Sequence, residues 1–174
     1  AGVGAFATQA KGNSPYGPKG LSFLKEGKSP EEVIELLLEN DEEKEHRQIG
    51  VIDAKGNTAN FTGEECIDWA GSIKAKNFSA QGNILVDEKT IENMASTFQS
   101  EKGALADRLV ASLKAGQKAG GDSRGRQAAA LYVVKENGSY HGYSDRYIDL
   151  RVDDHENPID ELDRLLNLFY KTFE

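Results

Sequence analysis

The sequence contains a single cysteine, Cys66, in 174 residues. One thiol cannot form an intrachain disulfide, so the packing of the core has to hold the fold, and a free thiol fits a reducing compartment. We therefore expect a cytoplasmic protein. A chain of this length buries roughly 68–70% of its unfolded surface, which is enough for a stable core without covalent staples. The sequence predicts a single domain over residues 1–174.

Long apolar runs and net positive charge are also missing. No stretch approaches the roughly 20 apolar residues that a membrane-spanning helix needs, and no segment is typical of a signal peptide. The formal net charge is −8, whereas binding to a nucleic-acid backbone depends on clustered lysine and arginine. We therefore expect neither a membrane nor a nucleic acid as a partner. The acidic run at 31–45 is interpreted as a solvated helix face.

Apolar periodicity and turn residues predict an ordered series of strands and helices. Ser29, Pro30 and Glu32 form a capping box with proline at the first helical position. Strands are expected at 1–9, 48–53, 58–62, 69–75, 78–85, 128–134 and 146–152. Helices are expected at 19–26, from Ser29 to about 43, from Asp87 through Phe98, from about 104 to either Gly116 or Gly120, and from Asn157 to the end.

The order of these elements favours an α+β architecture. Strand hairpins imply antiparallel pairing, and helix pairs between groups of strands imply helical layers that cover sheets. The apolar runs at 1–8 and 128–134 are typical of strands buried on both faces. The sequence therefore predicts a sandwich of two sheets with helices outside both.

The stretch 120–127 combines three glycines with Asp122, Arg124 and Arg126, and ends in Gln127. Guanidinium groups can grip a carboxylate with two parallel hydrogen bonds. If residues 122–127 are extended, the three charged side chains lie on one face. We expect this loop to bind a carboxylate or similar anion. The alternative is that Asp122 neutralises one arginine within a folded turn.

Two further candidates follow from residues near predicted strand ends. Gln81 and Asn83 lie where a strand is expected to finish, so that a side-chain amide could donate to an oxyanion. The alternative is an ordinary strand-end turn. Trp69 could form the wall of a ligand pocket, or it could belong to the core.

Asp153, Asp154 and His155 carry groups that could bind a metal or exchange protons. Three adjacent residues on a strand cannot all face one point. We therefore favour salt bridges at a helix entry for them, and expect neither a metal nor another cofactor. Cys66 is not expected to be a nucleophile, since two preceding glutamates should raise the pKa of its thiol.

Eight segments of the chain share their order and spacing with a known family. They are AGVGAFATQ (1–9), YGPKG (16–20), RQIGVID (47–53), FTG (61–63), WAG (69–71), QGN (81–83), the loop at 120–127, and RVDDH (151–155). The chain resembles the bacterial and archaeal domain of unknown function 1028 family, and the resemblance covers nearly its whole length. It implies an N-terminal-nucleophile (Ntn) hydrolase-like fold, which is a four-layer αββα sandwich.

Ntn hydrolases cleave amide bonds with the side chain of an N-terminal Thr, Ser or Cys, whose own α-amine is the base. Ala1 has no nucleophilic atom, and members of the family carry further strands before the segment at 1–9. Two hypotheses stay open. In the first, the protein is an Ntn-type amidohydrolase, or its descendant, acting on a small carboxylate-bearing amide, with its nucleophile outside this chain. In the second, it is a non-catalytic binding or assembly protein. Without the leading strands, exposed sheet edges would favour a homo-oligomer.

Overall fold

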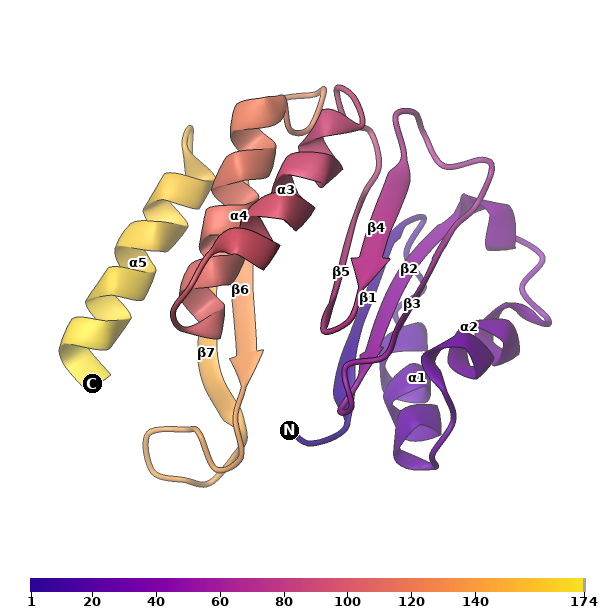
Figure 1. The fold of residues 1–174 in the computed structure, drawn as a ribbon, viewed down its shortest axis with the longest axis horizontal. Coiled ribbons are helices and arrows are strands. Elements are labelled where there is room, and N and C mark those ends of the chain that lie inside the picture. The colour runs from indigo at the N-terminus through magenta and orange to yellow at the C-terminus, as the bar shows by residue number, and fades with distance from the viewer. Residues whose placement is uncertain (174) are drawn as a thin grey trace.

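A computed structural model describes residues 1–173. Their order is β1 (Gly4–Ala10), α1 (Tyr16–Lys25), α2 (Pro30–Leu38), a 3-10 turn (Lys44–His46), β2 (Arg47–Asp53), β3 (Thr58–Thr62), β4 (Gly71–Ala75), β5 (Phe78–Gly82), α3 (Lys89–Ser100), α4 (Leu105–Ala119), β6 (Ala129–Val134), β7 (Arg146–Val152) and α5 (Pro158–Phe173). The α+β class is confirmed, with small antiparallel sheets. Helices α1 and α2 lie at one side of the molecule, and α3, α4 and α5 at the other (Figure 1). Within 1–173, no helix has both the length and the apolarity to cross a membrane.

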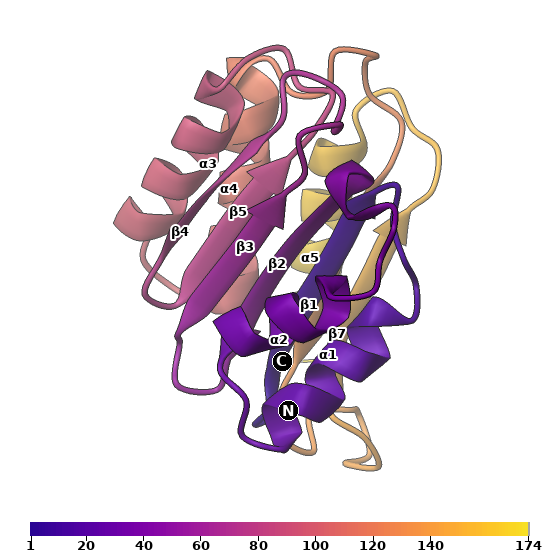
Figure 2. The same ribbon diagram turned by 90° about the vertical axis from the view of Figure 1, so that its right-hand side faces the viewer.

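The first sheet has the order β1-β2-β3, so β2 is its central strand. One face of β2 carries Ile49 and Val51, which are buried against Val33 and Leu37 of α2. Helices α1 and α2 cover this face (Figure 2). A Cβ atom added at Gly20 of α1 would come within 2.6 Å of the Phe6 ring. The helix can therefore lie close to the sheet only because this position has no side chain.

The opposite face of β2 contacts the β4–β5 hairpin. A Cβ atom added at Gly50 would lie 2.4 Å from the Gln81 side-chain amide, so glycine permits the close approach of the two layers. Helix α3 packs on the hairpin, and the Phe78 and Phe98 ring centroids are 5.4 Å apart. Gln81 and its neighbours therefore lie between two layers of strands.

The β6–β7 hairpin packs with α4 and α5 around a separate core that includes Val133, Ile148 and Leu162. Only one face of β6 is buried, because Tyr132 on the other face is 59% exposed. That face borders a groove of about 450 Å³ whose far wall includes Phe6 of β1. The prediction that 1–8 and 128–134 are buried on both faces is therefore wrong, since exposed and less exposed residues alternate along β1 and β6.

Several predicted elements are confirmed, and others have different bounds. Both hydrogen bonds of the Ser29–Glu32 capping box are present. Helix α4 ends at Ala119, with Gly120 as its C-cap, and continues past Gly116. Helix α2 ends at Leu38, well before the expected position near 43, and α1 begins three residues earlier than expected. The strands expected at 69–75 and 78–85 are shorter, so Trp69 and Asn83 lie just outside β4 and β5.

A buried ion pair lies just after the end of α2. Asp41 accepts hydrogen bonds from Arg47 Nε (2.8 Å) and Nη2 (3.1 Å), and also from the Tyr16 hydroxyl. The Asp41 and Arg47 side chains are only 10% and 7% exposed. The hydrogen bonds from Arg47 hold the pKa of Asp41 well below its usual range. Burial, together with the bond to Asp41, raises the pKa of Tyr16 to about 12.

Asp41→Asn should lower the free energy of unfolding by about 3 kcal/mol at pH 7, because it leaves the buried Arg47 charge with only the more exposed Glu43 as an acidic partner, at 3.1 Å. The lowered pKa means that the Asp41 carboxylate stabilises the fold above its unfolded pKa of 3.8. This stabilisation is lost as the pH falls through and below that value. Urea denaturation should therefore show a difference between wild type and variant that shrinks from pH 7 to pH 3.

Asp153→Asn is the matched control, because its ion pair with Arg151 lies on the surface. Exposed pairs contribute little to stability, so this variant should unfold like the wild type at both pH values. Equal unfolding of Asp41→Asn and wild type at pH 7 would contradict the assignment of Asp41 as a structural anchor.

Candidate functional site

The buried side-chain amide of Gln48 forms hydrogen bonds between the two layers of strands. Gln48 of β2 is 0% exposed. Its Nε2 donates to the carbonyl oxygens of Gly82 (2.8 Å) and Gly71 (3.1 Å), with Thr62 Oγ1 also 3.1 Å away. A carbonyl oxygen can only accept a hydrogen bond. These two contacts therefore determine which end of the Gln48 amide is nitrogen.

The other end of the Gln48 amide orients Asn83. Gln48 Oε1 accepts from Gln9 Nε2 (2.8 Å) and from Asn83 Nδ2 (3.2 Å). Both neighbours must direct an NH₂ group to this oxygen, since it cannot donate. Asn83 uses one N–H for this bond. Within residues 1–173, the second N–H of Asn83 has no hydrogen-bond partner.

Asn83 lines a cleft of about 510 Å³ at the point where β1 and β5 end and β2 begins. We call it the Asn83 cleft. Its cationic side chains outnumber its acidic ones, which suits an anionic guest. The polar residues that line it are Gln9, Lys11, His46, Glu65, Cys66, Asn83 and Arg124.

Most charged groups of the Asn83 cleft have partners of their own. His46 Nε2 lies 2.9 Å from Glu65 Oε2, and Lys11 pairs with Glu43 at the rim. Burial raises the pKa of the Cys66 thiol, whose sulfur lies 3.3 Å from the Arg47 carbonyl oxygen. The cleft therefore holds a neutral thiol, and the expectation of a raised pKa is confirmed, although the first cause is burial and not the neighbouring glutamates.

The loop at 120–127 begins with a tight turn. The Gly125 N–H donates to the Asp122 carbonyl oxygen at 3.1 Å, and Gly125 has φ +113°. The Asp122 carboxylate accepts from the Arg124 backbone N–H (2.8 Å), Nε (2.9 Å) and Nη2 (2.6 Å), which lowers its pKa. The condition of an extended 122–127 is not met, because the Asp122 side chain accepts from the N–H two residues on, as aspartate readily does. The folded-turn alternative describes Asp122 and Arg124.

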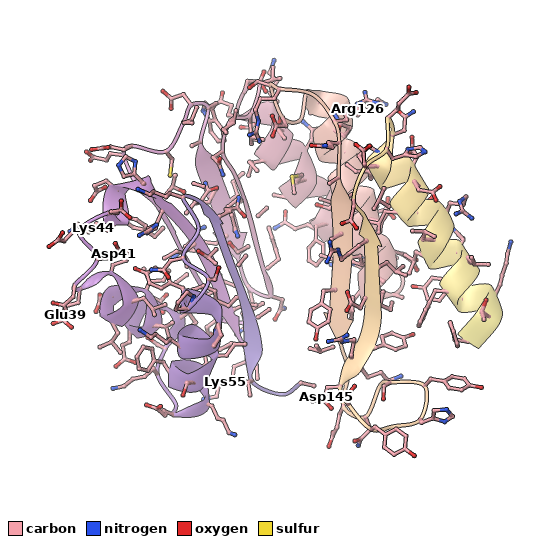
Figure 3. The ribbon with its side chains drawn as sticks, turned by 180° about the vertical axis from the view of Figure 1, so that it is seen from behind. Glu39, Asp41, Lys44, Lys55, Arg126 and Asp145 are labelled. Atoms are coloured by element: carbon pink, nitrogen blue, oxygen red, sulfur yellow. The ribbon has the colours of Figure 1, made fainter. Side chains whose placement is uncertain are left out.

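Arg126 points to a different partner. Its Nη1 donates to Asn157 Oδ1 at 2.9 Å, beside the beginning of α5 (Figure 3). A second hollow of about 620 Å³, here called the Arg126 groove, is lined by all four residues expected in the loop site: Asp122, Arg124, Arg126 and Gln127. Arg124 also lines the Asn83 cleft, so it stands between the two hollows.

The remaining candidates lie in different places. Gln81 Oε1 accepts from Ser79 Oγ at 2.9 Å, and the side chain lies against Gly50 between the layers. Trp69 packs over Gly71, where an added Cβ atom would come within 2.4 Å of the indole. Trp69 lines neither the Asn83 cleft nor the Arg126 groove.

The side chains of residues 153–155 each have a different hydrogen-bond or salt-bridge partner. Asp153 pairs with Arg151 at 2.6 Å, and His155 Nδ1 accepts from the Asn157 N–H at 2.9 Å. Asp154 alone lines the Arg126 groove, where it accepts from Gln127 at 3.4 Å. Across residues 1–173, no three His, Cys, Asp or Glu side chains gather in a way that could hold a metal ion.

Sequence reasoning overlooked Gln48, Gln9 and Lys11. One signal was present, since Gln48 is the polar residue at the head of the apolar run Ile49–Ile52. A buried amide in such a strand requires partners for its nitrogen and its oxygen. The partners of Gln48 come from segments that no local pattern connects to it.

The family model of DUF1028, a family of unknown function, matches residues 1–162. The chain belongs to the DUF1028 family. A crystal structure of protein SPO2555 from Silicibacter pomeroyi, also assigned to DUF1028, superposes with a TM-score of 0.83 at 30% sequence identity. The match covers 94% of this chain and 70% of that one. No curated protein matches the chain.

Gln48→Leu should lower the free energy of unfolding by about 2 to 4 kcal/mol, because it leaves several buried polar groups without a partner. It should also shift the side-chain NH₂ resonances of Asn83, whose acceptor is lost. Chemical denaturation and a ¹H–¹⁵N correlation spectrum measure the two effects.

Gln127→Leu removes an exposed amide of the same size and is the control. It should change neither the unfolding midpoint nor the Asn83 resonances. An unchanged Asn83 signal in a folded Gln48→Leu variant would show that Gln48 does not orient this side chain.

Proposed function

We propose that this DUF1028 protein binds a small carboxylate-bearing amide in the Asn83 cleft, as an Ntn-type amidohydrolase or its descendant. One observation carries the proposal: the Arg124 guanidinium and the Asn83 carboxamide line the same cleft. An arrangement of strands with α1 and α2 at one side and α3 to α5 at the other is what an αββα sandwich of the Ntn type would have (Figure 1).

Arg124 is proposed to hold the carboxylate of the ligand. Its Nε and Nη2 contact Asp122, but no hydrogen bond within residues 1–173 involves Nη1. The side chain is 69% exposed. An exposed ion pair of this kind is weak and exchanges readily with solvent, so a ligand carboxylate can share the guanidinium or take the place of Asp122.

Asn83 is proposed to donate its second N–H to the carbonyl oxygen of the ligand amide. Gln48 fixes the orientation of the Asn83 side chain, so little rearrangement is needed when charge develops on that oxygen. Preorganised donors of this kind stabilise the oxyanion formed during amide cleavage. Gln81 supports the same wall through the Gln9 contact to its carbonyl oxygen at 3.5 Å.

The described residues supply the binding part of this chemistry. The Cys66 thiol is held neutral by its raised pKa, which makes it a poor nucleophile. Cleavage of the Ntn type would use a Thr, Ser or Cys nucleophile that carries a free α-amine. Mass analysis and N-terminal sequencing of the native protein test this part of the proposal.

Assembly into a homo-oligomer is a second candidate role, favoured by one exposed feature. Tyr140, His141 and Tyr143 stand out on the β6–β7 connection, and the Tyr140 ring lies 5.5 Å from that of Phe173. Exposed aromatic clusters are enriched at protein interfaces. Light scattering of the wild type and of Tyr140→Ser tests this role, which predicts a larger species for the wild type alone.

Arg124→Ala should weaken the binding of N-acetylalanine by roughly tenfold or more, because a charge-assisted hydrogen bond is lost. It should leave the weaker binding of N-acetylalanine methylamide nearly unchanged, since that ligand has no carboxylate. Titration calorimetry, or ligand-detected NMR for weak binding, measures both affinities.

Arg151→Ala is the matched control, because Arg151 is 67% exposed and also pairs with a nearby aspartate, Asp153. Its affinities should equal those of the wild type. All variants should keep their unfolding midpoints. A stability loss in Arg124→Ala with unaltered N-acetylalanine binding would leave Asp122 and Arg124 with a purely structural role.

A further inference from the structure

We infer that a basin next to the Arg126 groove is a second anion site, and that the ligand of the Asn83 cleft carries a second negative group that reaches it. The part about the shared ligand rests on the proposed function. The basin holds about 290 Å³, and its polar lining consists of Lys114, Gln117, Lys118, Arg126, Asn157 and Asp160. We call it the Lys118 basin.

The charge of the Lys118 basin is opposite to that of the whole chain. Three of its lining residues are cations, Lys114, Lys118 and Arg126, and one is an acid, Asp160. The chain as a whole has a net charge of −8. Clefts lined by one sign of charge concentrate ions of the opposite sign. This local excess therefore favours an anionic group.

Among the described residues, two of the three cations form no salt bridge with an acidic side chain. Lys114 Nζ pairs with Asp163 at 2.7 Å. Neither Lys118 nor Arg126 forms a salt bridge within residues 1–173. Arg126 instead donates to the neutral carboxamide oxygen of Asn157. This bond positions the guanidinium without cancelling its charge, so Arg126 can still attract an anion.

The cations reach the basin from two parts of the chain. Lys114 and Lys118 are four residues apart on α4, so their side chains share one helix face, where like charges repel. Arg126 joins them from the loop that follows the helix (Figure 3). The amide of Gln117 lies over Gly121, 2.7 Å from where a Cβ atom would be. Asp163 already offsets the charge of Lys114, so an anion between these groups would interact chiefly with Lys118 and Arg126.

The basin continues into the proposed ligand site. Gln117 and Arg126 line both the Lys118 basin and the Arg126 groove, and Arg124 lines both that groove and the Asn83 cleft. A ligand with one carboxylate at Arg124 can therefore follow the groove towards Arg126. The chemistry of the basin suits a second carboxylate or a phosphate, and the experiment below separates the two.

The basin itself can be tested without the proposed function. Inorganic phosphate and acetate are titrated separately into the ¹⁵N-labelled wild type, and the Gln117 side-chain amide is followed by NMR. We expect saturable shifts that Lys118→Ala weakens at least fivefold. Lys171→Ala, which removes an exposed lysine from the far end of α5, should have no effect. Shifts that do not saturate, or that survive in Lys118→Ala, would overturn the anion site.

A ligand series then tests the link between the two sites. N-acetylalanine, N-acetyl-glutamyl-glutamate and N-acetylphosphoserine are compared by calorimetry. We expect Lys118→Ala to weaken a ligand with a second anion by about tenfold and to leave N-acetylalanine unchanged, whereas Arg124→Ala weakens all ligands. The ligand that depends most on Lys118 identifies the second anion as a carboxylate or a phosphate.

The failures of the two proposals are distinguishable. If N-acetylalanine binds and depends on Arg124 while added anions bring no dependence on Lys118, the link is wrong and the proposed function stands. If no ligand of the series binds, while phosphate still saturates the basin, the proposed function and the link both fail and the anion site alone remains.

Discussion

The position of the Asn83 cleft depends on the hydrogen bonds of the buried Gln48 amide. They join β2 to the ends of β3, β4 and β5 and to Asn83. Sheet side chains alternate, so a slip of β2 by one residue would turn Gln48 towards the apolar layer under α2, where its amide would lack partners. The amide therefore specifies the register of β2, and with it the position of the Asn83 cleft.

Local patterns predicted those parts of the fold whose causes are local. The capping box at Ser29 and the β2–β3 hairpin depend on residues a few positions apart. Gln48 bonds to carbonyl groups 23 and 34 residues away, which no local pattern records. The exposure of one face of β6 was missed for the same reason, because the burial of Tyr132 depends on what lies across the groove at Phe6. Composition and periodicity describe a strand, but not its neighbours.

For the loop at 120–127, residue types predicted which side chains lie near one another but not the conformation of the backbone. The charged residues were expected together, and they do line one groove. Their conformation was not predictable from alternation, because a short-range bond from the Asp122 side chain to the Arg124 N–H competes with the extended backbone. As a result Arg124 lines the Asn83 cleft as well as the groove, and Arg126 donates to Asn157 at the beginning of α5.

The overall negative charge does not oppose the binding of anions at these sites. Much of the acid lies in the segment 31–45, at or just after α2, whereas the Lys118 basin lies between α4 and α5 at the other side of the molecule (Figure 1). Charges in solution are screened over about 8 Å at physiological ionic strength. A ligand in the basin would therefore interact mainly with the charges that line it, which are Lys114, Lys118, Arg126 and Asp160, and only weakly with the acids of 31–45. The net charge of a protein affects its long-range association with other molecules, whereas the affinity of a pocket for an ion depends on the charges within about one screening length.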